Sequence, residues 1–248
     1  MPVEPLHLLL LFAVGALAGT INVMAGGGST LTLPVLIFLG LDGASANGTN
    51  RVAIALQNVF AVLSFKGENV SNARQSLVFA ACALPGSIVG ALVAVRISDE
   101  WFQRILGIVM LLVVVSMLLP RRRKQTTPEG IKSLWIYPVL FAIGFYGGFI
   151  QVGVGFLFMA AFYHLLKMNL VHVNLHKVFV VLIYTLPVLI IFAASGNINW
   201  ILGLSLAAGN SLGAWWAVKL AVRRGDKWVR IVMIIAILIM AAKILRLF

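Results

Sequence analysis

Two basic residues, Arg51 and Lys177, lie inside apolar stretches of the chain. Each lies about two helical turns into its stretch, at 46–65 and at 172–194. No Asp or Glu falls within an apolar stretch, so neither cation has an acidic partner at its depth. An unpaired charge inside a membrane is costly and is usually functional. We therefore expect both residues to bind an anion; the alternative is that both side chains snorkel to a nearby interface.

Glycine-rich turns interrupt two other apolar stretches. One turn reads Gly-Gly-Gly-Ser at 26–29, and the other reads Gly-Val-Gly at 153–155. Irregular backbone at membrane depth is tolerated only where it is buried or lines a cavity. The free N–H groups of a helix that starts after such a turn favour an anion. Glycines spaced four apart are explained instead by close helix packing; they occur at Gly15/Gly19, Gly86/Gly90 and Gly209/Gly213.

Polar residues close to these turns complete the candidate site. Side-chain amides can donate hydrogen bonds to an oxyanion, and an imidazole can carry a coupled proton near neutral pH. For any one of these residues, hydrogen bonding between helices is the alternative role. The predicted substrate site comprises Asn22, Gly26, Gly27, Gly28, Ser29, Asn50, Arg51, Gln151, Gly153, Gly155, His176 and Lys177.

The composition defines the class of protein. The chain has 248 residues, of which 61% are hydrophobic and 10% charged, and its mean hydropathy is +1.04. Several apolar runs approach the roughly 20 residues that cross a bilayer, which predicts a polytopic α-helical membrane protein. The net charge of +12 lies mainly in short loops, so it indicates membrane orientation rather than nucleic-acid binding. The single cysteine excludes an intramolecular disulfide and a cysteine-based metal cluster, and we expect no cofactor.

The apolar runs divide into two similar series. The first repeat, 1–120, has a broken hairpin at 6–41 (elements 6–24 and 30–41) and helices at 46–65, 74–96 and 101–119. A basic linker follows at 121–133. The second repeat, 134–248, has a hairpin at 134–166 (elements 134–150 and 153–166) and helices at 172–194, 198–221 and 228–247. The N-terminus lacks a basic leader, so the first run is expected to remain as a span.

Residues also match between the two series. GALAGTIN (15–22) aligns with GFYGGFIQ (144–151), Asn50-Arg51-Val52 with His176-Lys177-Val178, and GSIVGA (86–91) with GNSLGA (209–214). The constant order and nearly constant spacing of these matches indicate an internal duplication. The predicted fold is an all-α polytopic membrane protein with two inverted-topology repeats, each a broken helical hairpin plus three transmembrane helices.

Basic loops set the predicted topology. The 121–133 linker and the 221–230 loop are both rich in Arg and Lys, which places both in the cytoplasm. The chain must then cross an even number of times between them, so 134–166 is expected to act as a hairpin. The two halves then have opposite orientation, and both termini lie outside. Whether the hairpins cross fully or only re-enter is left open.

These motifs together resemble the TauE/SafE family of sulfite and organosulfonate exporters. The GGGS turn is followed by Pro34 and by GLDGASANGTN (40–50), and the second half carries GVG (153–155), GNINW (196–200) and GNSLGA (209–214). The resemblance covers essentially the whole chain. It implies transport of a small anion, typically a sulfur oxyanion or sulfonate, across a bacterial cytoplasmic membrane. The chain departs from the family pattern at GVGF (153–156) and VNLHK (173–177), which leaves the substrate open.

The resulting expectation is a membrane transporter and not an enzyme. We expect a secondary transporter, an exporter that works by alternating access, with the bilayer and a small anion as partners. A proton or ion gradient could drive it; no nucleotide-binding or nucleic-acid-binding motif is present. One alternative is an intramembrane serine hydrolase that uses Ser29 with His172 or His176. The other is a passive anion channel. The coupling ion and the oligomeric state are left open.

Overall fold

The computed structural model describes residues 4–68, 72–118 and 134–244, without most side chains of 110–118 and those of 224–244. All regular structure in these ranges is α-helix, as the sequence predicts. The expected linker at 121–133 lies outside the described residues. The helices are α1 (Pro5–Met24), α2 (Ser29–Phe38), α3 (Gly43–Gly67), α4 (Ala73–Ala94), α5 (Asp99–Leu118), α6 (Ile136–Phe149), α7 (Val154–Leu165), α8 (Leu170–Ala194) and α9 (Trp200–Ile244).

Helix length separates full spans from partial ones. Among the described residues, α1, α4, α8 and the Trp200–Arg223 part of α9 are each long and apolar enough to cross a membrane. The chain is therefore a multi-pass membrane protein. The helices α2 and α7 have only 10 and 12 residues. At 1.5 Å per residue each covers roughly half of a ~30 Å hydrocarbon core, so by length neither crosses it alone.

The C-terminal part differs from the sequence prediction. Two elements, 198–221 and 228–247, were expected with a loop between them, but α9 runs as one helix from Trp200 to Ile244. The expected loop contains one glycine, Gly225, and no proline. Its arginines and lysine are good helix formers, so nothing in this segment forces the helix to end. The charges mark the limit of the apolar span at Arg223, not the end of the helix.

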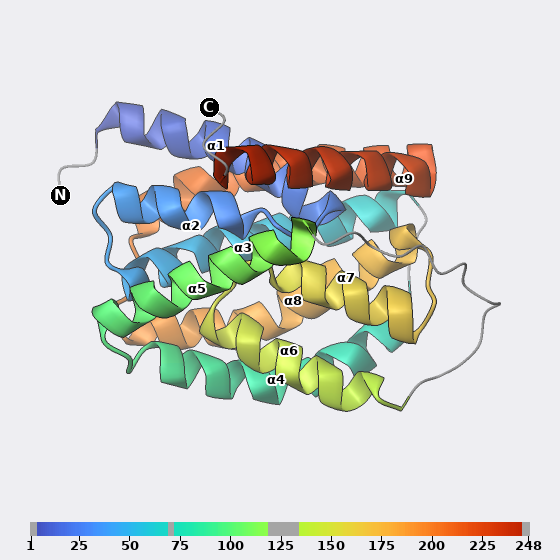
Figure 1. Cartoon of the computed structure of the whole chain (residues 1–248), viewed down its shortest axis with the longest axis horizontal. Helices are drawn as coiled ribbons and strands as arrows, with labels where there is room; N and C mark the ends of the chain where they lie inside the picture. The colour runs from blue at the N-terminus through green and yellow to red at the C-terminus, as the bar shows by residue number, and fades with distance from the viewer. Residues whose placement is uncertain (1–3, 69–71, 119–133, 245–248) are drawn as a thin grey trace.

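Two helical hairpins enter the molecule from opposite ends (Figure 1). The helix α2 returns to the end of the long axis at which α1 starts, and α7 returns to the end at which α6 starts. Short non-helical turns at 25–28 and 150–153 join the two helices of each pair. Each expected broken pair therefore forms a hairpin. This arrangement is compatible with the inverted repeat, which itself stays a prediction.

Glycines allow each hairpin to pack against a helix of the other half. The most extensive contacts join α1 to α9 and α4 to α6. A Cβ atom on Gly19 would lie 2.2 Å from the carbonyl oxygen of Asn210, and one on Gly148 would lie 2.0 Å from that of Ser87. Only glycine permits backbones to approach this closely. The expectation that the paired glycines serve close packing is confirmed, and the packing fixes α1 against α9 and α6 against α4.

Candidate functional site

The tips of the two hairpins touch each other. A Cβ atom on Gly155 would lie 2.4 Å from the Cα of Gly26, and one on Gly26 would lie 2.3 Å from the carbonyl carbon of Gly155. Gly26 also has a φ of 87°, in the left-handed region that favours glycine. The turns that precede α2 and α7, far apart in sequence, therefore meet backbone against backbone. Two of the predicted site residues are in direct contact here.

The remaining turn residues build the hairpin bends. Gly28 precedes α2, and a Cβ there would lie 2.3 Å from the carbonyl oxygen of Ala18 in α1. Gly153 precedes α7 with a φ of 70°. Gly27 accepts a 2.6 Å hydrogen bond from the Thr30 hydroxyl through its carbonyl oxygen. Ser29, the first residue of α2, is buried. These residues shape the hairpin tips and are not among the residues that line the cavity described below.

The side chain of Arg51 extends from α3 to the C-terminal end of α6. Its guanidinium donates to the carbonyl oxygens of Gly147 at 3.1 Å and Gly148 at 2.6 Å. It also donates to Gln151 Oε1 at 3.3 Å and to Asn47 Oδ1 at 3.5 Å. The side chain is 0% exposed. Asn47 supports the arrangement by donating to the carbonyl oxygen of Phe149 at 2.9 Å.

In the corresponding way, the side chain of Lys177 extends from α8 to the C-terminal end of α1. Its ammonium donates to the carbonyl oxygens of Asn22 at 3.0 Å and Val23 at 2.7 Å, and to Asn174 Oδ1 at 2.8 Å. The sulfur of Met159 lies 3.6 Å away. The residue is 3% exposed. Each cation therefore belongs to one half of the chain and donates hydrogen bonds to the first hairpin helix of the other half.

These contacts change the interpretation of both cations. Neither Arg51 nor Lys177 snorkels to an interface, because both are buried. Their partners are carbonyl oxygens in the last turn of a helix, whose C-terminus carries about half a negative charge. The missing acidic partner is thus partly replaced by backbone. A sequence gives no signal for this, because carbonyl oxygens occur at every residue.

A small cavity lies where the two hairpins meet. Its volume is about 10 Å³, which is room for about one water molecule. The lining comes from both hairpins and from α3 and α8: Asn22, Asn58, Gln151, Val154, Gly155, Lys177, Val178 and Val181. Four of these were predicted from the sequence: Asn22, Gln151, Gly155 and Lys177.

Asn58 is a cavity residue that the sequence analysis missed. It lies seven residues after Arg51 on α3, so both residues lie on nearly the same face of that helix. That spacing was the available signal. Asn58 donates to the Ile54 carbonyl oxygen at 2.7 Å and is almost fully buried. Tyr184, seven residues after Lys177, donates to Gln151 Oε1 at 3.2 Å and so contacts the same site.

Two predicted residues lie away from the cavity. Asn50 Oδ1 accepts a 2.7 Å hydrogen bond from the Thr32 hydroxyl, which joins α3 to α2. His176 Nδ1 lies 2.8 Å from the Ser76 hydroxyl, and its ring lies edge-on to Phe79, which joins α8 to α4. Both residues serve contacts between helices, the alternative role considered for them.

The hydrolase alternative finds no support in this geometry. Among the described residues no hydrogen bond joins Ser29 to a histidine. His176 contacts Ser76 instead, and His172 is exposed and lies 2.9 Å from Asn169 Oδ1. A nucleophile needs its base within hydrogen-bonding distance. The site offers positive charge and amide donors rather than a nucleophile and a base.

Comparison with known proteins identifies the family. The family model "Sulfite exporter TauE/SafE" matches residues 11–244. The chain is 28% identical to the "Probable membrane transporter protein YfcA" of Escherichia coli K12, over 98% of this chain and 91% of that protein. It is 30% identical to a "Probable membrane transporter protein" of Haemophilus influenzae, over 95% and 93%. No solved structure matches. The chain belongs to the sulfite exporter TauE/SafE family.

Proposed function

We propose that the protein is a secondary transporter that exports a small anion, a sulfite, sulfonate or related sulfur oxyanion, across the bacterial inner membrane by alternating access. The observation that carries the proposal is the convergence of Lys177, Asn22, Asn58 and Gln151 on one cavity between two broken hairpins. One positive charge and several amide donors suit an oxyanion. The family and the names of its relatives support the class of membrane transporter.

Gln151 is oriented to donate to the anion. Its Oε1 accepts hydrogen bonds from Arg51 at 3.3 Å and from Tyr184 at 3.2 Å. An amide whose oxygen is held by two donors presents its NH₂ group elsewhere. The residue lines the cavity, so these N–H donors are available to an oxyanion there. Arg51 is thus a positioning residue that acts on the substrate through Gln151.

The charges of the site favour a monoanion. Arg51 and Lys177 bring two positive charges, and the C-termini of α6 and α1 offset about half a charge each. About one unit of positive charge is left between the hairpins. A monoanion balances this charge, whereas a dianion leaves an excess negative charge in a buried site.

Substrate entry requires the hairpins to separate. The cavity holds about one water molecule, and an oxyanion such as sulfite has four heavy atoms. The backbone contact between Gly26 and Gly155 lies beside the cavity and closes it. The two hairpins enter from opposite ends of the molecule (Figure 1). Movement of one tip would therefore open the site toward one side of the membrane. Movement of the other tip opens it toward the opposite side.

The test is anion flux into liposomes that contain purified protein. We expect saturable flux of methanesulfonate and of hydrogen sulfite, the monoanion that sulfite forms in mildly acidic solution, and much slower flux of sulfate, a dianion. Lys177→Gln should lower the flux about a thousandfold, because a charge pair at 4 Å contributes about 4 kcal/mol at an effective dielectric constant near 20. Arg51→Gln should lower it less than Lys177→Gln, because Arg51 acts through Gln151. Anion-induced shifts in the unfolding temperature report binding independently of flux.

Matched controls separate the proposal from its alternatives. Arg104→Gln removes an exposed cation that pairs with Glu100 on α5, and flux should be unchanged. Ser29→Ala should retain transport, whereas a hydrolase would lose its activity. Flux of the anion against its own gradient, driven by a proton or ion gradient, distinguishes a transporter from a passive channel. Flux that Lys177→Gln leaves intact would overturn the proposed site.

The proposed orientation follows from the basic segments. We place 121–133 in the cytoplasm and both termini outside, which requires the chain to reverse direction within α9 near Arg223; in Figure 1 the red C-terminal part of α9 runs back along the molecule. A reporter enzyme that is active only outside the cytoplasm, fused to Phe248, should be active. The same reporter inserted at 126 should be inactive. The reverse result would invert the topology while leaving the anion site unchanged.

A further inference from the structure

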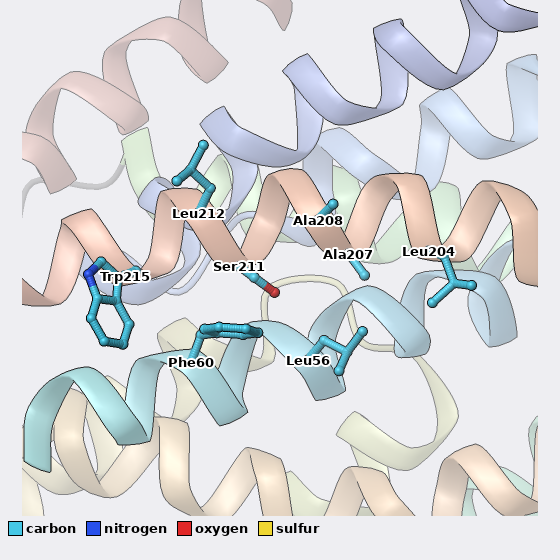
Figure 2. Close-up of a pocket in the computed structure, with 8 residues that line it drawn as sticks. All are labelled: Leu56, Phe60, Leu204, Ala207, Ala208, Ser211, Leu212 and Trp215. Carbon is cyan, nitrogen blue, oxygen red and sulfur yellow. The ribbon is translucent and has the colours of Figure 1, made fainter.

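A second cavity lies on the outer surface between α3 and α9, about 530 Å³ in volume and distinct from the anion site. Figure 2 shows Phe60 and Leu56 of α3 opposite four α9 side chains, those of Leu204, Ala207, Ser211 and Trp215. The lining is almost wholly apolar. Leu56, Phe60 and Leu204 are 37%, 41% and 53% exposed. The volume lies in the range of ligand sites of roughly 300–1,000 Å³.

One polar atom points into this apolar groove. Ser211 lies midway along it, and Figure 2 shows its hydroxyl directed toward Phe60 and Leu56. The residue is only 7% exposed, and its Oγ has no hydrogen-bond partner among the described residues. A buried hydroxyl without a partner is costly. It indicates that a ligand in the groove carries an acceptor at this depth.

Positive charge lies at one end of the groove. The Lys219 ammonium lies 5.0 Å from the centre of the Trp215 ring, and Trp215 closes that end of the lining. Ser211 lies one turn before Trp215, roughly 6 Å along the helix axis. The groove therefore has a cationic end, a hydroxyl about one turn deeper, and an apolar remainder.

We infer that this groove binds an anionic phospholipid. The phosphate lies at Lys219, an ester carbonyl accepts from the Ser211 hydroxyl, and one acyl chain follows the groove past Leu56 and Leu204. Lys219 is one turn from the end of the apolar span at Arg223, which is the depth of a headgroup. The observed sequence of charge, hydroxyl and apolar lining matches the order of groups along a phospholipid. A second copy of this chain would supply an apolar face but no phosphate for Lys219.

Native mass spectrometry of the purified protein, with phosphatidylglycerol or phosphatidylcholine added at equal mole fractions, tests the inference. Wild type should retain phosphatidylglycerol preferentially. Ala208→Phe fills the groove from an exposed lining position and should lower retention of both lipids at least tenfold. Ala81→Phe, at an exposed alanine of α4 outside the groove, is the matched control and should change nothing. Both variants should keep the wild-type unfolding temperature.

The cationic end is tested separately. Lys219→Gln should lower the preference for phosphatidylglycerol about fivefold, which corresponds to about 1 kcal/mol per basic residue. Lys219→Arg should restore the preference, because it keeps the charge. Equal retention of the two lipids by wild type, or unchanged retention in Ala208→Phe, would overturn the inference. Loss of a dimer in Ala208→Phe without loss of lipid would assign the groove to a second copy instead.

Discussion

The contact between the hairpin tips makes a sharp prediction for Gly155→Ala. Gly155 is a helical residue of α7, where alanine is ordinarily more favourable than glycine by about 1 kcal/mol. The new Cβ, however, would lie 2.4 Å from Gly26 Cα and 2.5 Å from Gly26 O. The tips must then move apart by about 1 Å to reach an ordinary contact near 3.4 Å. Both partners are backbone, so no side chain can rotate away, and overpacking of this kind costs about 1–3 kcal/mol.

We therefore expect a net loss of stability in Gly155→Ala, together with altered transport. Thermal unfolding and sulfite flux in liposomes measure the two effects. Gly107→Ala is the matched control, because Gly107 is also helical and its Cβ would meet nothing within 4 Å. That variant should be as stable as wild type or more stable. A Gly155→Ala protein that gains stability as Gly107→Ala does, with unchanged flux, would refute the contact and the closure that depends on it.

Three further predictions concern single residues. Asp42→Ala should lower stability by about 1 kcal/mol at pH 7, because its carboxylate caps α3. Burial alone would raise the pKa of Asp42, but hydrogen bonds from Ser45 outweigh burial and lower the pKa. The stability that the cap contributes should therefore be lost as the pH falls through this lowered pKa. Wild type and Asp42→Ala with the same dependence of unfolding temperature on pH would contradict this. Asn58→Leu should raise the KM for the anion about tenfold at similar stability, since it removes one donor, and an unchanged KM would exclude Asn58 from the site. Gly153→Ala should cost about 1–2 kcal/mol because φ is 70°, and Gly153→Asn should recover part of it; equal unfolding temperatures would argue against this backbone conformation.

The lengths of the apolar runs were sufficient to predict most helices. The glycine turn at 26–29 and the one at 153–155 interrupt runs that are otherwise continuous, and the helices end within a few residues of them. The region around 221–230 could not be predicted in the same way. Its charges suggest a loop, yet Arg and Lys have high helix propensity and α9 continues through them. A polar segment reports the membrane boundary, whereas a helix end needs a proline or an unfavourable backbone conformation.

The candidate site was predicted in part, for a geometrical reason. Lys177 and His176 are consecutive on α8, so their side chains point about 100° apart and cannot both face one cavity. Asn50 and Arg51 are related in the same way on α3. Without the fold, the face of each helix that meets the hairpins is unknown. The carbonyl partners of both cations could not be predicted either, because they depend on which helix of the other half ends beside each cation.

The contacts of Lys177 suggest how substrate binding and hairpin movement are linked. An ammonium has three donors, and Lys177 already has three oxygen acceptors within 3.0 Å: the carbonyls of Asn22 and Val23 and the Asn174 amide. An anion that enters the cavity must therefore take a donor from one of these acceptors. If that acceptor is a carbonyl of α1, the C-terminus of the helix loses part of its attachment to α8. The Gly26 tip that follows α1 is then freer to leave Gly155. The anion and the carbonyls of α1 would thus compete for the same three N–H groups, so that occupancy of the site favours its opening.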